Sequence, residues 1–138
     1  VNMNIAVCGP IAYGDIEKIK RLQEILEKEK FDVIDQFLSK EMDYSCIKDF
    51  RDNKKLAEKI VSNDLSFIEK SDLIIAICDQ PSFGTAIEMY YAKQLGKMVI
   101  VLSEREQPSP WPIAFADIIV KDINTLIDVL KTILNRNL

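Results

Sequence analysis

Histidine is absent from the 138 residues of this chain, and cysteine is scarce, with three residues at unrelated spacings. Without histidine, Ser-His-Asp and Cys-His catalysis and the common histidine-based zinc sites are excluded. Acid–base chemistry is then left to carboxylates, lysine, tyrosine or cysteine. Cys8 and Cys78 lie inside apolar, strand-like runs, which indicates small buried residues. The sequence therefore predicts no disulfide framework, no metal site and no cofactor.

Long apolar runs and clustered positive charge are missing too. No run approaches the ~18 residues that cross a bilayer, and no signal-peptide pattern opens the chain, so we expect a cytoplasmic protein. Lys and Arg number 18 against 22 Asp and Glu, a net charge of −4, and the two signs are interleaved. Nucleic acids and anionic membranes need clustered positive charge, so neither partner is expected. A small anionic ligand held by a few basic groups and backbone amides is not excluded.

The residues that are present alternate between apolar and amphipathic patterns. Hydrophobic residues make up 48% and charged residues 29%, as in a globular domain, and we expect residues 1–138 to form a single domain. Strands are predicted at 4–9, 31–37, 72–78, 98–104 and 117–122, and helices at 14–30, 53–72, 84–96 and 123–136. This order predicts an α/β fold, a doubly wound, mostly parallel five-stranded sheet of flavodoxin or Rossmann type with helices on both faces. Residues 38–52 and the Pro-rich residues 105–116 are expected to be loops, the first with or without a short irregular helix.

Glu88 follows the central predicted strand and permits two interpretations. In "QPSFGTAIE" the residues Thr85 to Glu88 fit a capping box, in which the carboxylate only closes the start of a helix. Ligands of parallel sheets bind beyond the carboxyl ends of the strands, however, and this loop lies there. A carboxylate kept ionised by a helix N-terminus can attack a ligand, while Gly84 permits close backbone approach and Ser82 and Thr85 bind hydroxyl or phosphate oxygens. The spacing fits both interpretations.

Asp64 is the second candidate carboxylate. It lies beside Ile60 and Ile68 at helical spacing, at the border of an apolar stripe. There it is either an exposed helix residue or an acid with a raised pKa that can donate a proton. Two carboxylates in different environments are the usual equipment for breaking a glycosidic bond, one at the anomeric carbon and one protonating the leaving group.

A family resemblance is carried by three segments. "SNDLSFIEKSDLIIAICDQPSFGTAIEMYYAKQLGKMVIVL" resembles the nucleoside 2-deoxyribosyltransferase superfamily, with Asn-Asp-Leu on a helix, Gly-x-x-x-Glu after a strand, and Gly-Lys before the next strand. "AVCGPIAYGD" resembles that family's first strand and substrate loop, and "QPSFG" is similar to the Gln-Pro-Ser-x-Gly loop of 2'-deoxynucleoside 5'-monophosphate N-glycosidases. The resemblance implies an enzyme that cleaves or transfers at the N-glycosidic bond of a (deoxy)nucleoside or its 5'-monophosphate.

The resemblance also implies roles for individual residues. Glu88 matches the nucleophile that forms a glycosyl-enzyme, and Asp64 matches the acid that exchanges a proton with the leaving base. Ser82 matches the phosphate-binding serine of the N-glycosidase branch. The remaining residues of the substrate loops that match are Gly9, Ile11, Gly84 and Thr85.

The first loop departs from the N-glycosidase branch. That branch has Ser-Ile-Arg where this chain has Pro10-Ile11-Ala12, so two phosphate-binding side chains are missing. Arg51 or Arg105 either replaces them or belongs to the solvated surface.

Several aromatic residues also fall near the expected ligand edge. Tyr90 and Tyr91 replace small residues of the family, and they either fill space near the sugar or only pack. Trp111 can stack on a base, cover a neighbouring subunit or be an ordinary buried residue. Tyr13 and Tyr44 lie in loops that can touch substrate.

Two other functions are compatible with the sequence. Pro-x-x-Gly-Thr-x-x-Glu is similar to phosphoribohydrolases that free cytokinin-type bases, although their longer Gly-Gly loop and Arg motif are missing. A non-catalytic nucleotide-binding module, with Thr85 and Glu88 only capping a helix, is the other alternative. In each case the partner is a nucleoside or nucleotide. A homo-oligomer is expected, because "MVIVL" and the last helix offer apolar surface to cover. The family resemblance implies that its pocket lies near the subunit contact.

Overall fold

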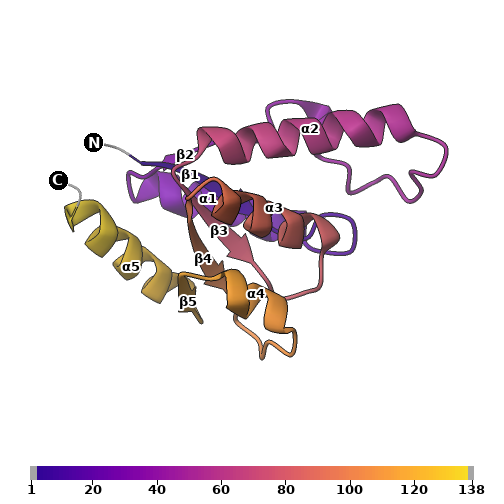
Figure 1. Cartoon of the computed structure of the whole chain (residues 1–138). Helices are drawn as coiled ribbons and strands as arrows, with labels where there is room; N and C mark the ends of the chain where they lie inside the picture. The colour runs from indigo at the N-terminus through magenta and orange to yellow at the C-terminus, as the bar shows by residue number, and fades with distance from the viewer. Residues whose placement is uncertain (1–2, 137–138) are drawn as a thin grey trace.

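Five parallel strands form one sheet at the centre of the molecule (Figure 1). The computed structural model describes residues 3–136. The strand order is β2-β1-β3-β4-β5, with every neighbouring pair parallel, which confirms the predicted α/β sheet. The strands are β1 (Asn4–Cys8), β2 (Asp32–Val33), β3 (Leu73–Ile77), β4 (Met98–Leu102) and β5 (Ile118–Val120).

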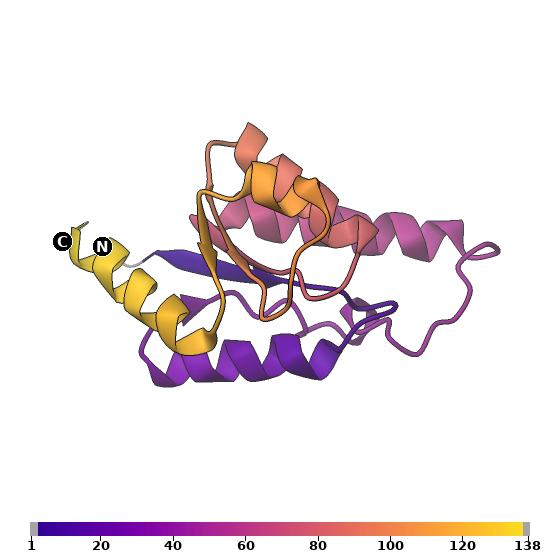
Figure 2. The ribbon, with the colours of Figure 1, turned by 90° about the horizontal axis from the view of Figure 1, so that it is seen from below.

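Helices cover both faces of the sheet. Figure 2 shows α1 and α5 on one side and α2, α3 and α4 on the other. The bounds are α1 (Ile16–Lys28), α2 (Lys54–Lys70), α3 (Phe83–Gln94), α4 (Pro110–Phe115) and α5 (Ile123–Arg136), with a short 3₁₀ helix at Lys40–Met42. Within residues 3–136, no helix is long and apolar enough to span a membrane.

Side-chain alternation along the strands builds two separate cores. The core under α1 and α5 contains large aliphatic residues such as Ile5, Val7 and Ile75. The core under α2 and α3 contains small strand residues, Ala6, Cys8, Ala76 and Cys78, together with Ile74, Val99 and Val101. Small side chains leave more room above that face of the sheet.

The strand order reverses between β1 and β3, and this position is where ligands bind in such sheets. Cys8 ends β1 beside Ala76 of β3. The loops after β1 and β3 therefore leave the sheet side by side at its carboxyl edge. The long loop between β2 and α2 runs to the same side of the molecule (Figure 2).

The ends of α2 and α3 are tied together at the opposite edge of the sheet. Lys97, just after α3, donates hydrogen bonds through Nζ to the backbone oxygens of Glu69 and Ser71, at 2.9 and 2.5 Å. These carbonyls belong to the last turn and cap of α2, where the helix leaves its acceptors unpaired. The Tyr91 hydroxyl adds a 2.8 Å hydrogen bond to the Glu69 carboxylate.

Three sequence-based predictions need correction. The Pro-rich segment contains helix α4, because Ser109 caps it and its prolines occupy the first turn, where a missing N–H costs nothing. The second strand is two residues long instead of spanning 31–37. "MVIVL" is not uncovered surface, since it forms the internal strand β4 with four of five residues buried.

Candidate active site

Asp64 and Glu88 come together between α2 and α3, although 24 positions separate them in the sequence. Each lies six residues before the last residue of its helix, Lys70 or Gln94, and the two helices run in the same direction between parallel strands. The Asp64 charge raises the pKa of Glu88, as expected for two close carboxylates. The convergence of the two acids that the glycosidase interpretation needs is thus present.

Helix α3 begins earlier than the capping-box interpretation requires. Its cap is Ser82, whose Oγ accepts hydrogen bonds from the Thr85 amide and the Thr85 hydroxyl, at 3.2 and 3.0 Å. Phe83 and Gly84 are therefore helical, and Glu88 lies in the second turn. The capping box from Thr85 to Glu88 is wrong, and Glu88 is not needed to close the helix.

Burial sets the acidity of the pair. Desolvation raises the pKa of Asp64 from 3.8 to about 6, the direction that its position at an apolar border predicted. Desolvation, followed by the neighbouring Asp64 charge, raises the pKa of Glu88 well above its ordinary value. The expectation that the helix N-terminus keeps Glu88 ionised does not hold, because helix-dipole effects fall off within the first turn. Near neutral pH the pair can hold one proton between them.

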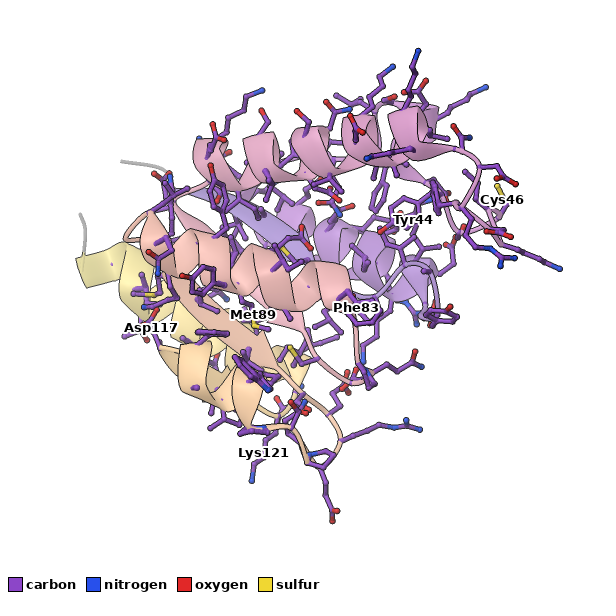
Figure 3. All side chains as sticks on the ribbon, turned by 45° about the vertical axis from the view of Figure 1, so that its right-hand side comes forward. Tyr44, Cys46, Phe83, Met89, Asp117 and Lys121 are labelled. Atoms are coloured by element: carbon purple, nitrogen blue, oxygen red, sulfur yellow. The ribbon has the colours of Figure 1, made fainter. Side chains whose placement is uncertain are left out.

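Two further side chains surround the acids. Tyr44 comes from the loop between β2 and α2, and burial together with the charges of Asp64 and Glu88 raises its pKa to about 12. Figure 3 shows Tyr44 beneath α2, on the same side of the molecule as Phe83 at the start of α3. Cys8, at the end of β1, is buried, and burial followed by the charges of Glu88 and Asp64 raises its pKa well above the ordinary value. Both groups keep their protons near neutral pH and can act as donors.

Contacts from neighbouring residues hold Tyr44 in place. Its ring packs edge-on against Phe50, with centroids 5.8 Å apart. The preceding residue, Asp43, accepts a 3.0 Å hydrogen bond from Lys20 of α1 and a 2.6 Å hydrogen bond from the Ser45 hydroxyl. The hydrogen bond from Lys20 therefore anchors the loop to α1 at the residue next to Tyr44.

Helix α3 separates the acid pair from a larger cavity. Tyr91 on the α2 side bonds to Glu69, whereas Tyr90 on the α4 side packs edge-on against Phe115, with centroids 5.8 Å apart. The α4 side holds a cavity of about 750 Å³ whose walls include Ser82, Thr85, Tyr13, Ile87 and Trp111. Neither Asp64 nor Glu88 lines this cavity. The expected phosphate-binding residues thus lie at the start of α3, next to this space, with Thr85 about one turn and Ser82 nearly two turns before Glu88.

A smaller, polar cavity of about 260 Å³ lies on the α1 side of the carboxyl edge. Lys18 spans it by pairing with Asp79 and, at 2.8 Å, with Glu104. Asp79 also accepts a 2.8 Å hydrogen bond from the Glu104 amide. Arg105 lines both cavities and is exposed, whereas Arg51 pairs with Asp49 at 2.8 Å on the surface. Arg105 is therefore the arginine placed near the candidate substrate loops.

The three remaining candidates lie in different surroundings. A Cβ at Gly9 would come within 3.0 Å of Ile19 and 3.4 Å of Ile77, so glycine permits close packing of the first loop on α1. Ile11 is buried in the core under α1. A Cβ at Gly84 would lie 3.9 Å from Oε1 of Glu88, which shows that Gly84 is next to the carboxylate.

Cys8 and, in large part, Tyr44 escaped sequence analysis. The apolar run around Cys8 correctly indicated a buried residue, but no pattern says which helix lies above it. Tyr44 lies in a segment without periodicity, so its position could only be narrowed to the ligand edge. Of the other aromatic residues, Tyr90 and Tyr91 pack against neighbouring helices, while Tyr13 and Trp111 are exposed in the walls of the larger cavity.

Comparison with known proteins gives a consistent result. The chain is similar to the 2-deoxyribosyltransferase from the psychrotolerant bacterium Bacillus psychrosaccharolyticus, with a TM-score of 0.69, 17% identity and 90% of each chain covered. It is also similar to the Clostridium botulinum CMP N-glycosidase BcmB, with a TM-score of 0.57, 20% identity, and 94% of this chain and 98% of that chain covered. No curated protein matches the sequence. The sequence pattern of nucleoside 2-deoxyribosyltransferases matches residues 6–130, and the chain therefore belongs to the nucleoside 2-deoxyribosyltransferase family.

Proposed function

We propose that this chain is an enzyme that cleaves or transfers at the N-glycosidic bond of a (deoxy)nucleoside or nucleoside 5'-monophosphate. The observation that carries the proposal is the meeting of Asp64 and Glu88 at the carboxyl edge of the sheet, with raised pKa values. Family membership and the two structural neighbours, a deoxyribosyltransferase and a CMP N-glycosidase, support the same reaction class.

The proposed reaction has two steps. In the first, a Glu88 carboxylate oxygen forms a bond to the anomeric carbon of the sugar while the bond from that carbon to the base nitrogen breaks. The electron pair of the broken bond goes to the base, which takes the proton from Asp64. In the second step, water or another base displaces Glu88 from the sugar, and Asp64 accepts the proton of that nucleophile. Asp64, with a pKa of about 6, suits both directions of proton transfer.

The substrate would be positioned by the loops at the same edge. Gly84, beside the Glu88 carboxylate, lets the sugar approach the helix closely. We propose that Gly9 and Ile11 contribute backbone groups of the first loop, and that Ser82 and Thr85 bind sugar hydroxyl or phosphate oxygens. Arg105 lines the same cavity as Ser82 and Thr85, which favours it over Arg51 for a phosphate.

The test is incubation of the protein with mixed nucleosides and 5'-monophosphates, with and without a free acceptor base, followed by chromatography. Base release is expected from the wild-type protein and from Glu58→Gln, which changes an exposed carboxylate on α2. Glu88→Ala should release none. A sugar adduct on the peptide containing Glu88, seen by mass spectrometry after rapid quenching, would identify the intermediate. Undiminished turnover by Glu88→Ala would contradict the mechanism.

We also propose that the protein acts as a homo-oligomer, with the subunit contact on the face formed by α3 and α4. Phe83, Ile87 and Trp111 on this face are 90%, 58% and 64% exposed, and they adjoin the larger cavity. Contiguous exposed apolar surface of this kind usually marks an interaction site. Light scattering after gel filtration should show an oligomer for the wild-type protein and a smaller species for Ile87→Arg. An unchanged mass for this variant would place the contact elsewhere.

A further inference from the structure

We propose that Lys18 is a positioning residue, which pairs with Asp79 and Glu104 at once and so holds the loop after β3 against the loop after β4. We call these three side chains the Lys18 clamp. The first loop carries Ser82 and the second carries Arg105, so the clamp sets the spacing between these two side chains in the walls of the larger cavity. The proposal rests on the function proposed above, in which both side chains hold the substrate.

The two loops leave the sheet from the neighbouring strands β3 and β4. The Cys78 amide makes one more backbone hydrogen bond beyond β3, to the Leu102 oxygen at 2.9 Å. After this point side chains take over. The Glu104 amide donates a 2.8 Å hydrogen bond to Oδ1 of Asp79, and Nε2 of Gln107 donates a 2.7 Å hydrogen bond to the Cys78 oxygen. The relative position of the loops therefore depends on a few side-chain bonds, among which those of Asp79 are central.

Lys18 adds a connection from a third element. It lies in the first turn of α1, where Asp15 caps the helix and accepts a hydrogen bond from the Lys18 amide. Its ammonium group pairs with Oδ2 of Asp79 and, at 2.8 Å, with Oε1 of Glu104. Asp79 thus uses both carboxylate oxygens, one for Lys18 and one for the amide of Glu104. A single ammonium group joins α1 to both loops.

The charges around Lys18 make the loops sensitive to its loss. The side chains of Lys18 and Asp79 are 26% and 14% exposed, so water and salt screen their attraction less than that of a surface pair. Burial acts to lower the pKa of Lys18, but hydrogen bonds with Asp79 and Glu104 raise it above its ordinary value, so the ammonium form persists. Without this cation, Asp79 and Glu104 would be two negative charges on adjoining loops. Arg105 is the other basic residue in the walls of the polar cavity, and it is exposed.

The two acids lie outside the clamp. Neither Asp64 nor Glu88 lines the polar cavity or the larger cavity. Burial is the first cause of their raised pKa values, and Lys18 is not among the causes. Loss of the clamp should therefore weaken substrate binding while the acids keep their acidity. In kinetic terms, KM rises and kcat is maintained.

Amide hydrogen exchange tests the clamp on the resting protein, without turnover. Lys18→Met removes the charge and keeps an unbranched side chain, and its Glu104 amide should exchange about 3- to 10-fold faster than in the wild-type protein, as measured by NMR. Lys18→Arg keeps a charge that can reach both carboxylates and should leave the rate within about 2-fold. Lys131→Met breaks a 3.2 Å ion pair with Glu29 at the other end of α1 and should leave the Glu104 amide unchanged.

Steady-state kinetics with the best substrate from the mixed incubation give the second readout. In Lys18→Met, KM should rise about 3- to 10-fold while kcat stays within about 2-fold of the wild-type value. Lys18→Arg should restore KM. Asp79→Asn keeps an oxygen for the Glu104 amide but loses the charge that Lys18 pairs with. It should move KM and the exchange rate in the same direction, and it replaces Lys18→Met as the test if that variant does not fold.

Three outcomes separate the clamp from the proposed function. Unchanged exchange at Glu104 in both Lys18→Met and Asp79→Asn would overturn the proposal, whether or not the protein is active. A fall in kcat with KM unchanged would overturn it as well, because Lys18 would then act on the chemistry and not on binding. Faster exchange in a protein that releases no base from any substrate would support the clamp and contradict only the proposed function.

Discussion

The two faces of the central sheet have different tasks, although they share the same strands. On the α1–α5 face, strands contribute large aliphatic residues, among them Ile75, Ile77, Ile100 and Leu102. On the α2–α3 face, the residues at the switch between β1 and β3 are small: Ala6, Cys8, Ala76 and Cys78. Both acids lie above the second face. The α1–α5 face is packed with large aliphatic side chains, whereas the small residues on the α2–α3 face leave room for polar groups.

This difference explains how the protein can hold two carboxylates close together. Burying a charged group costs free energy unless partners compensate for it. The acids are half-buried beside the α2–α3 core, and their charges raise the pKa values of Cys8 and Tyr44 after burial does, so both of these side chains stay protonated. Burial of the large aliphatic residues on the α1–α5 face offsets the free energy that burying the two carboxylates costs. Four changes would break or sharpen this comparison.

The largest effect is expected from Asp64→Asn. Loss of the proton donor should reduce base release by about 10²- to 10⁴-fold with poor leaving bases, as is typical for a general acid. The loss should be much smaller for a nucleoside whose base leaves without protonation. A uniform loss with both kinds of substrate, measured by steady-state kinetics, would argue that Asp64 only supports the fold.

A core truncation on the α1–α5 face should act on stability alone. Ile75 is fully buried there, and Ile75→Ala should lower the free energy of unfolding by about 2–5 kcal/mol. Urea unfolding measures this change, and kcat of the remaining folded protein should equal that of the wild-type protein. A large loss of kcat would show that the two faces are not independent.

Enlarging a small residue on the α2–α3 face should affect activity more than stability. Ala76→Leu adds bulk beside Cys8, and overpacking of this kind costs about 1–3 kcal/mol. The expected loss of activity is greater than the loss of stability, because the added side chain displaces Cys8 or α3 and with it Glu88. Calorimetry and kinetics on one preparation would compare the two losses. Full activity would mean that the space above this face is not needed.

The smallest effect is a pH dependence of stability. The folded protein raises the pKa of Asp64 from 3.8 to about 6, so between about pH 4 and pH 6 it binds more protons than the unfolded chain. Stability should therefore fall as the pH rises through this window, and Glu88, also raised, extends the fall in the same direction. Asp43 and Asp49, whose pKa values are lowered by hydrogen bonds, oppose this only at lower pH, where they become protonated.

Melting temperatures from pH 4 to pH 7 would measure this dependence. Asp64→Asn should flatten the curve, while a neutral substitution of the exposed Glu58 should leave it unchanged. A wild-type curve that rises through this window would show that the acids are better solvated than the structure indicates.

The sheet and its helices could be predicted because their residues repeat with clear periods. Leu73–Ile77 is apolar at every position, as a strand covered on both faces must be, and α1 shows an unbroken amphipathic stripe. Helix α4 could not be found in this way, because it is six residues long and contains two prolines. The predicted start of α3 at residue 84 is one residue from the observed start, but the capping box chose Thr85 as the cap instead of Ser82, because both residues are good caps and only the tertiary structure chooses between them.

The two candidate acids could be selected from the sequence, but the side chains that surround them could not. Asp64 and Glu88 carry local signals, a stripe border and a turn after a central strand. The electrostatic influence of Glu88 on Cys8 depends on how α3 packs above β1, and the sequence pattern does not contain this packing. The placement of Ser82 and Thr85 in the walls of the larger cavity, which neither acid lines, is likewise visible only in three dimensions.

The bonds from Lys97 to the last turn of α2 have a mechanical consequence. They hold the C-terminal ends of the two acid-bearing helices together, at the end remote from the acids. Small rotations about that fastening change little near Lys97 but alter the gap between Asp64 and Glu88, where a sugar would enter. Lys97, which lies far from the acids, can thus influence the distance between Asp64 and Glu88.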